Sequence, residues 1–376
     1  MRLARAIGAV LATRYRAFLT PRIIAERRDL FRGGIEDRYV GAFLDDHAYA
    51  IDARETRADR IASVIELLRV AALSSYENRP ISTGVLLLGT AGDPCRPAHT
   101  VDPAAPTYTD TLTRLKSFYR LADGVRTVFL GNVDGRLLDI IDIGRWSREV
   151  CGAARSDSLC AKAFEAHARA TQYHGHVCAV LSPSHEIKVF AEGAEVFTFR
   201  GAAWHLLDLN AKYALWSAAI GDQALALRLF QTALDLADAR EGALFVVVRD
   251  PQTAVPQLVS AADRLDIPVR AGDGSEPPSR RDLLHLLAGR TVTDLDETVF
   301  SALATVDGAT VIDPAGRLLA AGAILRHPPT EELARGGIVE GARTTAALAA
   351  SRFGPVLKVS EDGVITFFDG ARIWDI

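Results

Sequence analysis

The segment Val306-Asp-Gly-Ala309 contains a carboxylate that could serve as a catalytic group. A carboxylate such as Asp307 can hold a divalent cation or a hydroxyl, and Gly308 and Ala309 leave space for a ligand beside it. The same Asp-Gly pair also suits a helix-to-strand turn, because glycine tolerates backbone angles that other residues avoid. The motif alone leaves both interpretations open.

A second motif combines a cation, two hydroxyls and a predicted helix start. It consists of Gly341, Ala342, Arg343, Thr344 and Thr345. Free backbone N–H groups at a helix N-terminus and a guanidinium together favour binding of an anion. The simpler interpretation is that Thr344 or Thr345 is the N-cap residue of that helix.

A third motif follows the apolar segment 355–359. Ser360 and Glu361 stand where this predicted strand ends, and Glu361 there can bind a hard cation. Asp362-Gly363 is equally typical of an ordinary hairpin turn.

The order and spacing of four motifs are more specific than any one of them. "GALFVVV" at 242–248, "DGA" at 307–309, "GARTT" at 341–345 and "VSED" at 359–362 follow one another in this sequence. Over residues 212–376 the pattern resembles the diadenylate cyclase domain, the family that includes the N-terminal domain of the DNA-integrity scanning protein. The family pattern has His-Asp-Gly-Ala, Gly-Thr-Arg-His-Arg-Ala-Ala and Ser-Glu-Glu motifs in the same order.

The resemblance implies an α/β domain with a twisted mixed sheet flanked by helices. It also implies that two ATP molecules are condensed into cyclic di-AMP with release of pyrophosphate. ATP is then the substrate, Mg²⁺ or Mn²⁺ the cofactor, and a face-to-face homodimer or higher oligomer the active assembly. Transferred by position, the catalytic residues are Asp307 and Arg343, and the metal ligands are Asp307 and Glu361. The nucleotide-binding residues are Gly308, Ala309, Gly341, Ala342, Thr344, Thr345 and Ser360.

The chain departs from the family pattern at two places. Val306 replaces the histidine before Asp-Gly-Ala, and Thr344-Thr345 replace a histidine and an arginine. Arg326 or His327 could compensate from a neighbouring loop. Two function classes therefore stay open: a divergent cyclase, and a module that senses ATP or a cyclic dinucleotide without turnover.

Composition narrows the remaining possibilities. The chain has 376 residues, of which 49% are hydrophobic and 24% charged, enough for two or three cores. A net charge of -4 gives no electrostatic reason to expect nucleic acid or an anionic membrane as a partner. The apolar start of the chain is interrupted by Arg14 and Arg16, so neither a membrane span nor a signal peptide is expected. A cytoplasmic protein is the expectation.

Periodicity predicts alternating helices and strands that position the motifs. We expect an N-terminal α/β sensor or regulatory domain at 1–205 and the cyclase-like domain at 206–376, with an antiparallel meander over 177–199. The helices are predicted at 4–20, 55–75, 108–122, 208–240 and 295–305; the strands at 84–89, 127–131 and 242–248; and the loops at 93–107 and 271–280.

The two halves of the sequence resemble each other. Segment 132–140 is similar to 312–322, and 175–197 to 354–374, with similar spacing in both halves. A distant duplication explains this similarity, as does a chance match of short strand-turn-strand sequences. A duplicated first half would be a degenerate copy without the Gly-Ala-Arg motif.

One cluster of possible zinc ligands stands in the first half. "HGHVC" is predicted to place His174, His176 and Cys178 on one face of a strand. Upstream of them come Cys151, Cys160 and His167. The spacing of these residues is not a usual zinc pattern, and buried thiols and partly exposed imidazoles explain them as well.

Overall fold

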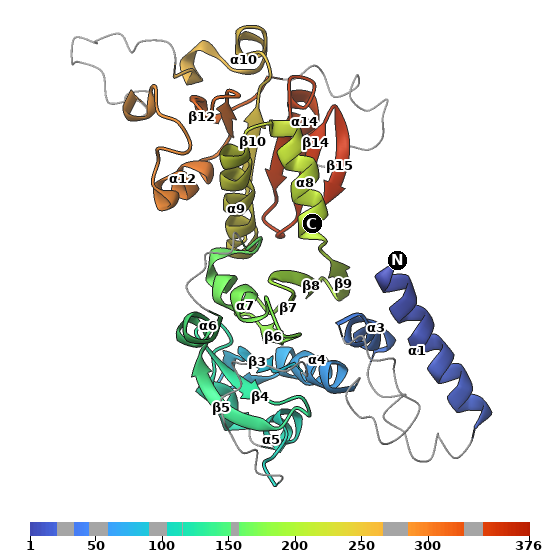
Figure 1. Cartoon of the computed structure of the whole chain (residues 1–376). Coiled ribbons are helices and arrows are strands. Elements are labelled where there is room, and N and C mark those ends of the chain that lie inside the picture. Colours follow the sequence, from blue (N-terminus) through green and yellow to red (C-terminus); the bar gives the residue numbers. More distant parts are fainter. Residues whose placement is uncertain are drawn as a thin grey trace. The chain divides into compact units, whose positions relative to one another are not determined.

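The computed structural model describes residues 1–20, 34–44, 59–89, 104–114, 116–151, 158–265, 285–326 and 341–376. These residues form two units, Met1–Leu207 and Asp208–Ile376. Each unit contains one large mixed β-sheet with helices packed on it, which confirms the α/β fold class (Figure 1). Most of the expected loop 93–107 and all of 271–280 lie outside the described residues.

Unit 1 contains helices α1 to α7 and strands β1 to β9. The helices are α1 (Arg2–Leu19), α3 (Ile35–Leu44), α4 (Asp59–Ala72), α5 (Tyr108–Arg114), α6 (Ile143–Cys151) and α7 (Glu165–Ala170), with 3-10 helices η2 (Lys116–Leu121) and η3 (Lys162–Phe164). The strands are β1 (Ser75–Tyr76), β2 (Arg79–Pro80), β3 (Thr83–Leu87), β4 (Thr127–Gly131), β5 (Leu137–Asp142), β6 (Val177–Leu181), β7 (Ile187–Ala191), β8 (Ala194–Arg200) and β9 (Ala203–Leu206).

Unit 2 contains the remaining described elements. Its helices are α8 (Leu209–Ile220), α9 (Gln223–Ala239), α10 (Pro251–Leu258), α12 (Glu297–Ala304) and α14 (Ala342–Ala350), with η4 (Ala261–Asp263) and η5 (His285–Leu287). Its strands are β10 (Ala243–Val247), β11 (Ala309–Ile312), β12 (Leu318–Ala323), β13 (Val356–Val359), β14 (Ile365–Asp369) and β15 (Ala371–Asp375).

The two large sheets share one strand order. Unit 1 has the order β5-β4-β3-β6-β7-β8-β9, and unit 2 has β12-β11-β10-β13-β14-β15. In each sheet one pair is parallel, β3 with β4 and β10 with β11, and the other pairs are antiparallel. The second sheet therefore repeats the first, apart from the added edge strand β9.

Two turns repeat with the same hydrogen bonds. Before β5, the Asn132 side chain accepts from the backbone N–H groups of Asp134 and Arg136. Before β12, Asp313 accepts from Ala315 and Arg317 in the same way.

In the hairpins after β6 and β13, the N–H groups of Ser182 and Ser360 each donate to the carbonyl four residues on. These turns fix which positions of the two units correspond. The similar sequence segments of the two halves thus fold alike.

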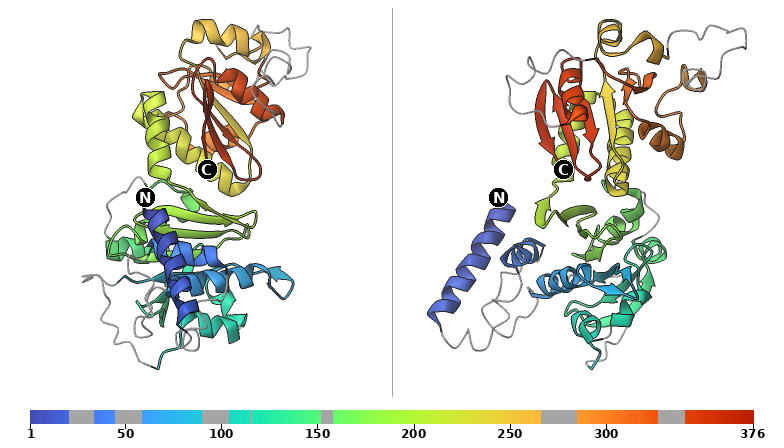
Figure 2. Two further views of the ribbon diagram at one scale, coloured as in Figure 1. Left: turned by 90° about the vertical axis from the view of Figure 1, so that its right-hand side faces the viewer. Right: turned by 180° about the vertical axis from the view of Figure 1, so that it is seen from behind.

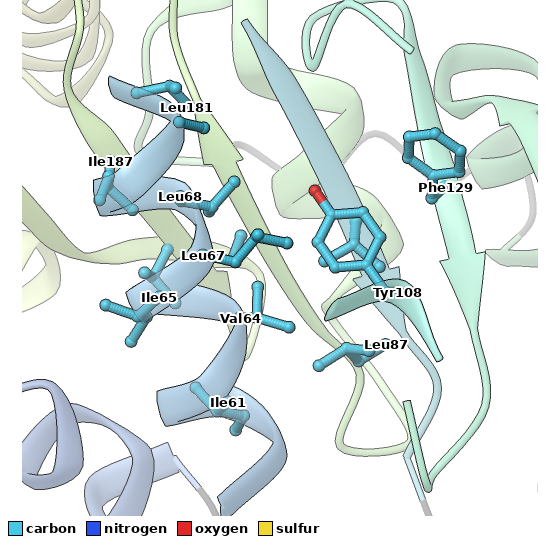
Figure 3. Packing of buried hydrophobic residues seen from close by; sticks show 14 of the residues in the cluster. Ile61, Val64, Ile65, Leu67, Leu68, Leu87, Tyr108, Phe129, Leu181 and Ile187 are labelled. Carbon is cyan, nitrogen blue, oxygen red and sulfur yellow. The ribbon is translucent and has the colours of Figure 1, made fainter. Parts of the chain in front are cut away.

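The central strands β3, β4 and β6 of unit 1 are apolar on both faces because helices cover both. Val85 and Leu87 of β3 belong to the core under α4, whereas Leu86 and Leu88 belong to the core under α6 and α7. Figure 3 shows the first core, in which α4 side chains such as Ile65 and Leu68 pack beside residues of the sheet. Alternate burial on two faces explains the continuous apolar run of β3.

Unit 2 has the same three layers. Ala347 and Ala350 of α14 pack on one face of the sheet with Val246 and Val356. On the other face, α8 and α9 lie against β14 and β15. There the ring centroids of Trp216 and Phe367 are 5.3 Å apart. Figure 2 shows α14 and the α8–α9 pair on opposite sides of the sheet. The helix that carries Arg343 is thus anchored by an alanine face.

Two expectations about the extent of helices and strands are wrong. The predicted helix 208–240 is two helices, because Gly221 has φ +83° and Asp222 caps α9 by accepting from the N–H of Leu225.

His174 and His176 do not share a strand with Cys178. His174 and Gly175 have φ of +62° and +67°, and this turn ends before β6 begins at Val177.

Helix α1 buries only one stripe of small side chains. Ala6, Val10, Thr13 and Ala17 recur at helical spacing and are buried, whereas Tyr15 and Phe18 are exposed. No helix among the described residues has both the length and the apolar character that a bilayer crossing requires.

His167 of α7 is the buried titratable group of unit 1 with the clearest energetic consequence. Its ring packs between Phe164 and Phe190, and Nε2 lies 2.9 Å from the carbonyl oxygen of Gly124. Nδ1 has no hydrogen-bond partner among the described residues. Burial lowers the pKa of His167 to about 4, so the folded protein holds the imidazole neutral.

Acidification should therefore destabilise the protein through His167. The unfolded chain takes up a proton near pH 6.5 and the folded chain only near pH 4, so stability falls as the pH drops between these values, by on the order of 3 kcal/mol. His167→Phe should remove this part of the pH dependence in urea unfolding at pH 7, 5.5 and 4.5. His205→Gln, at an exposed histidine of the same unit, should keep it. An unchanged pH dependence in His167→Phe would contradict the assignment.

Candidate nucleotide site

The predicted site residues of unit 2 gather at one end of its sheet. β10 and β11 run parallel and both begin at this end, where Gly242 and Gly308 precede them. β13 runs antiparallel to β10, with Val359 opposite Ala243, so Ser360 and Glu361 emerge at the same end. Strand directions alone thus bring together motifs that lie far apart in the sequence.

Arg343 is the centre of the charged group at this end. Its Nη1 donates to Oε1 of Glu361 at 2.8 Å, and its Nη2 lies 3.9 Å from Oδ1 of Asp307. The carboxylates are open to solvent, with 90% of the Asp307 side chain and 72% of the Glu361 side chain exposed, against 38% for Arg343. The structure therefore joins three of the predicted residues into one cluster that a soluble ligand can reach.

The lack of a side chain at Gly242 leaves space for the guanidinium of Arg343. A Cβ at position 242 would lie 2.1 Å from Nη1 and 2.8 Å from Cζ of Arg343. Only a residue without a side chain lets the guanidinium lie this close to the start of β10. Gly242 was not among the predicted site residues, although its strand belongs to the family pattern.

The glycine of the "VDGA" motif, Gly308, has a structural role. It has φ +118°, and a Cβ there would lie 2.3 Å from the backbone carbon of Gly322 in β12. Gly308 thus serves a tight turn against β12, and the next residue, Ala309, is buried in the core. Asp307 stands just outside this turn with its carboxylate toward Arg343. The motif is a structural turn that also presents a carboxylate.

Helix α14 begins within the "GARTT" motif. Its N-cap is Gly341, with φ +83° and no side-chain capping hydrogen bond, and its first residue is the exposed Ala342. Capping by Thr344 or Thr345 is therefore wrong. Thr345 is buried and its hydroxyl donates to the carbonyl of Gly341 at 3.2 Å. Among the described residues, no side-chain cap accepts from the backbone N–H groups of the first turn.

Lys358 is a member of the site that sequence reasoning missed. It stands in β13, and its Nζ donates to Oγ1 of Thr344 at 3.1 Å. Burial lowers the pKa of Lys358, the charge of Asp362 raises it, and the charges of Arg372 and Arg343 lower it further. A lysine between two apolar residues of a buried strand was the available signal.

The corresponding end of unit 1 carries different residues. Counting from the turns at Asn132 and Asp313, Arg126 stands at the position of Asp307. Counting from the hairpins at Ser182 and Ser360, Val180 matches Lys358 and Pro183 matches Glu361. Unit 1 thus keeps the fold and lacks the chemistry of this site.

The remaining predicted candidates lie elsewhere. Arg326 follows β12 and is exposed, and His327 lies outside the described residues. Cys178 is fully buried, and burial raises its pKa well above the usual range for a thiol. Nδ1 of His176 accepts from the N–H of Gly89. Across the described segments, no three His, Cys, Asp or Glu side chains are grouped to hold a metal ion.

Comparison with solved structures gives matches of low sequence identity. No protein-family model and no curated protein matches this chain. A double mutant of DacA from Staphylococcus aureus is 18% identical, with a TM-score of 0.26, over 40% of this chain and 86% of that one. A hypothetical membrane spanning protein from Bacillus cereus is 20% identical, with a TM-score of 0.27, over 39% of this chain and 61% of that one. These values are too low to assign a function.

Gly308→Ala should destabilise unit 2. A Cβ at a positive φ and within 2.3 Å of the β12 backbone forces either the turn or the strand to move, at a cost of roughly 3 kcal/mol. Gly370→Ala is the matched control, because Gly370 has φ +70° but nothing within 4 Å of an added Cβ. Gly370→Ala should lower the free energy of unfolding by about 1 kcal/mol. Urea unfolding of both variants measures the two losses. Equal losses in the two variants would show that the contact with β12 is not limiting.

Proposed function

We propose that unit 2 binds ATP and condenses two ATP molecules into cyclic di-AMP, releasing two pyrophosphates. The observation that carries this proposal is the position of Arg343. The guanidinium lies at the N-terminus of α14, over Gly242, between the carboxylates of Asp307 and Glu361.

The phosphates are the part of ATP that this arrangement suits best. A guanidinium binds phosphate oxygens in a bidentate manner, and the N–H groups of an uncapped first turn add donors and a positive dipole. Gly341 carries no side chain that would block approach to this turn. We assign phosphate binding to Arg343 and the first turn of α14.

The two carboxylates fit a divalent cation. Mg²⁺ in nucleotide enzymes is held by one or two carboxylates and completes its shell with phosphate oxygens and water. Asp307 and Glu361 provide such exposed oxygen ligands on either side of Arg343. A bound Mg²⁺ or Mn²⁺ would offset negative charge on the triphosphate.

The reaction consists of two equivalent displacements. In each, the 3'-hydroxyl of one ATP attacks the α-phosphate of the other, a new P–O bond forms, and pyrophosphate leaves. Asp307 is suited to accept the proton of the hydroxyl, and Arg343 to stabilise the charge on the phosphates. Positioning of the two reactants supplies much of the rate.

Within the described part of the chain, one such site is present. Unit 1 has Arg126, Val180 and Pro183 where unit 2 has Asp307, Lys358 and Glu361. The second ATP would then come from unit 2 of another copy. This supports a face-to-face homodimer or a higher oligomer as the active assembly.

A second function is favoured by the residues of the family pattern that this chain lacks. The side chain of Val306 has no ligand atom, and the residue is 39% exposed beside Asp307. Thr344 and Thr345 replace a histidine and an arginine, and loss of such charge-stabilising groups costs on the order of 10² in rate per group. A module that binds ATP or a cyclic dinucleotide without turnover has no need of them.

Product analysis separates the two functions. Purified protein incubated with ATP and Mn²⁺ or Mg²⁺ should form cyclic di-AMP, detected by mass spectrometry. Asp307→Ala should reduce the initial rate by a factor on the order of 10² or more. Asp369→Asn, which removes a carboxylate paired with Arg249 at the opposite end of the sheet, should retain the rate. Tight binding of ready-made cyclic di-AMP, with no product from any nucleoside triphosphate, would instead support the sensor.

Gly242→Ala tests the position of Arg343 separately from its charge. The added Cβ meets the end of a flexible side chain, so the guanidinium moves and the fold loses little stability, about 0.5 kcal/mol. Affinity for ATP, measured by calorimetry, should fall about tenfold because the bidentate geometry is lost. A drop in stability without a change in affinity would contradict this role.

A further inference from the structure

We infer that Lys358 is a specificity-determining residue that, together with Arg343, recognises the polyphosphate chain of a nucleotide. The inference rests on the function proposed for unit 2 and adds to it a residue and a selectivity. The nucleotide should be held by its phosphates from two elements, α14 through Arg343 and β13 through Lys358.

The surroundings of Lys358 are unusual for a lysine. Its neighbours in β13, Leu357 and Val359, are fully buried, and Lys358 itself is only partly exposed. Its ammonium has three donors, and the hydrogen bond described for it goes to the neutral hydroxyl of Thr344. Among the residues that the structure describes, it forms no ion pair with a carboxylate. Two donors of a partly desolvated cation are therefore left for another acceptor.

The electrostatic setting also favours an anion there. Lys358 reaches the first turn of α14, where the helix dipole is positive and Arg343 already places a guanidinium. Burial lowers the pKa of Lys358, and the like charge of Arg343 lowers it further. Placing two cations at the positive end of a helix is unfavourable in the free protein. A bound anion would offset this repulsion, because it attracts both cations and the positive end of the helix.

The donors suit a chain of phosphates better than one small anion. Arg343 offers a planar fork and Lys358 a compact point charge, and the two come from different elements. The carboxylates that fit a cation stand on the Arg343 side of this pair. Two cations and a pair of metal-binding carboxylates together match the several charges of a triphosphate.

A purely structural role is the competing explanation. The hydrogen bond from Lys358 to Thr344 could simply hold the start of α14 against β13. Such a role predicts loss of stability on removal of the ammonium, with equal effects on every ligand. Polyphosphate recognition predicts little loss of stability and an effect that grows with the number of phosphates.

The experiment measures binding of ATP, ADP, AMP and adenosine by calorimetry in the full-length protein. Lys358→Met should weaken ATP binding roughly ten- to hundredfold and leave adenosine binding unchanged. Lys358→Arg should restore most of the ATP affinity, because it keeps the charge. Arg249→Met, which removes a cation at the opposite end of the sheet, should leave all four affinities unchanged.

The outcomes separate this inference from the proposed reaction. If wild type binds ATP without forming a dinucleotide and Lys358→Met loses the preference for ATP over adenosine, the reaction is wrong and the inference holds. If wild type forms cyclic di-AMP and Lys358→Met keeps that preference, the inference alone is wrong. A lower unfolding midpoint with an unchanged preference shows a structural role and overturns it, as does failure of wild type to bind ATP.

Discussion

The structure of unit 2 depends on the direction of three adjacent strands. β10 pairs in parallel with β11 and antiparallel with β13, so two strand starts and one strand end meet at one edge of the sheet. This pairing places Asp307 and Glu361 beside the same guanidinium. The sheet and α14 therefore bring Asp307, Arg343 and Glu361, which stand in three separate motifs, into one charged group.

Two glycines fix the distances within that group. Gly308 allows the turn before β11 to lie against Gly322, and Gly242 allows Arg343 to lie over the start of β10. Alanines 347 and 350 hold α14 on the sheet, so the helix start and the strand ends keep one geometry. Small residues, rather than strong interactions, make the close approach possible.

The two units show how one fold carries different chemistry. Both have the same strand order and the same hydrogen-bonded turns, because these depend on backbone geometry and on a few short side chains. The ionisable residues of the unit 2 site are not repeated in unit 1, where Val180 and Pro183 stand instead of Lys358 and Glu361. Instead, α7 of unit 1 carries the buried, neutral His167. A fold of this kind is therefore no evidence of activity by itself.

The sequence by itself determined the α/β class, most of the strands and the motif residues that surround Arg343, because periodicity and turn chemistry are local properties. It did not reveal the break at Gly221-Asp222 within the predicted helix 208–240, since both helices are apolar enough to read as one. Nor did it show that Gly341, and not a threonine, caps α14. Only the tertiary structure showed that Lys358 and Gly242 belong to the site. Their roles arise from contacts with α14 across the sheet, and such contacts depend on strand order and register rather than on neighbouring residues in the chain.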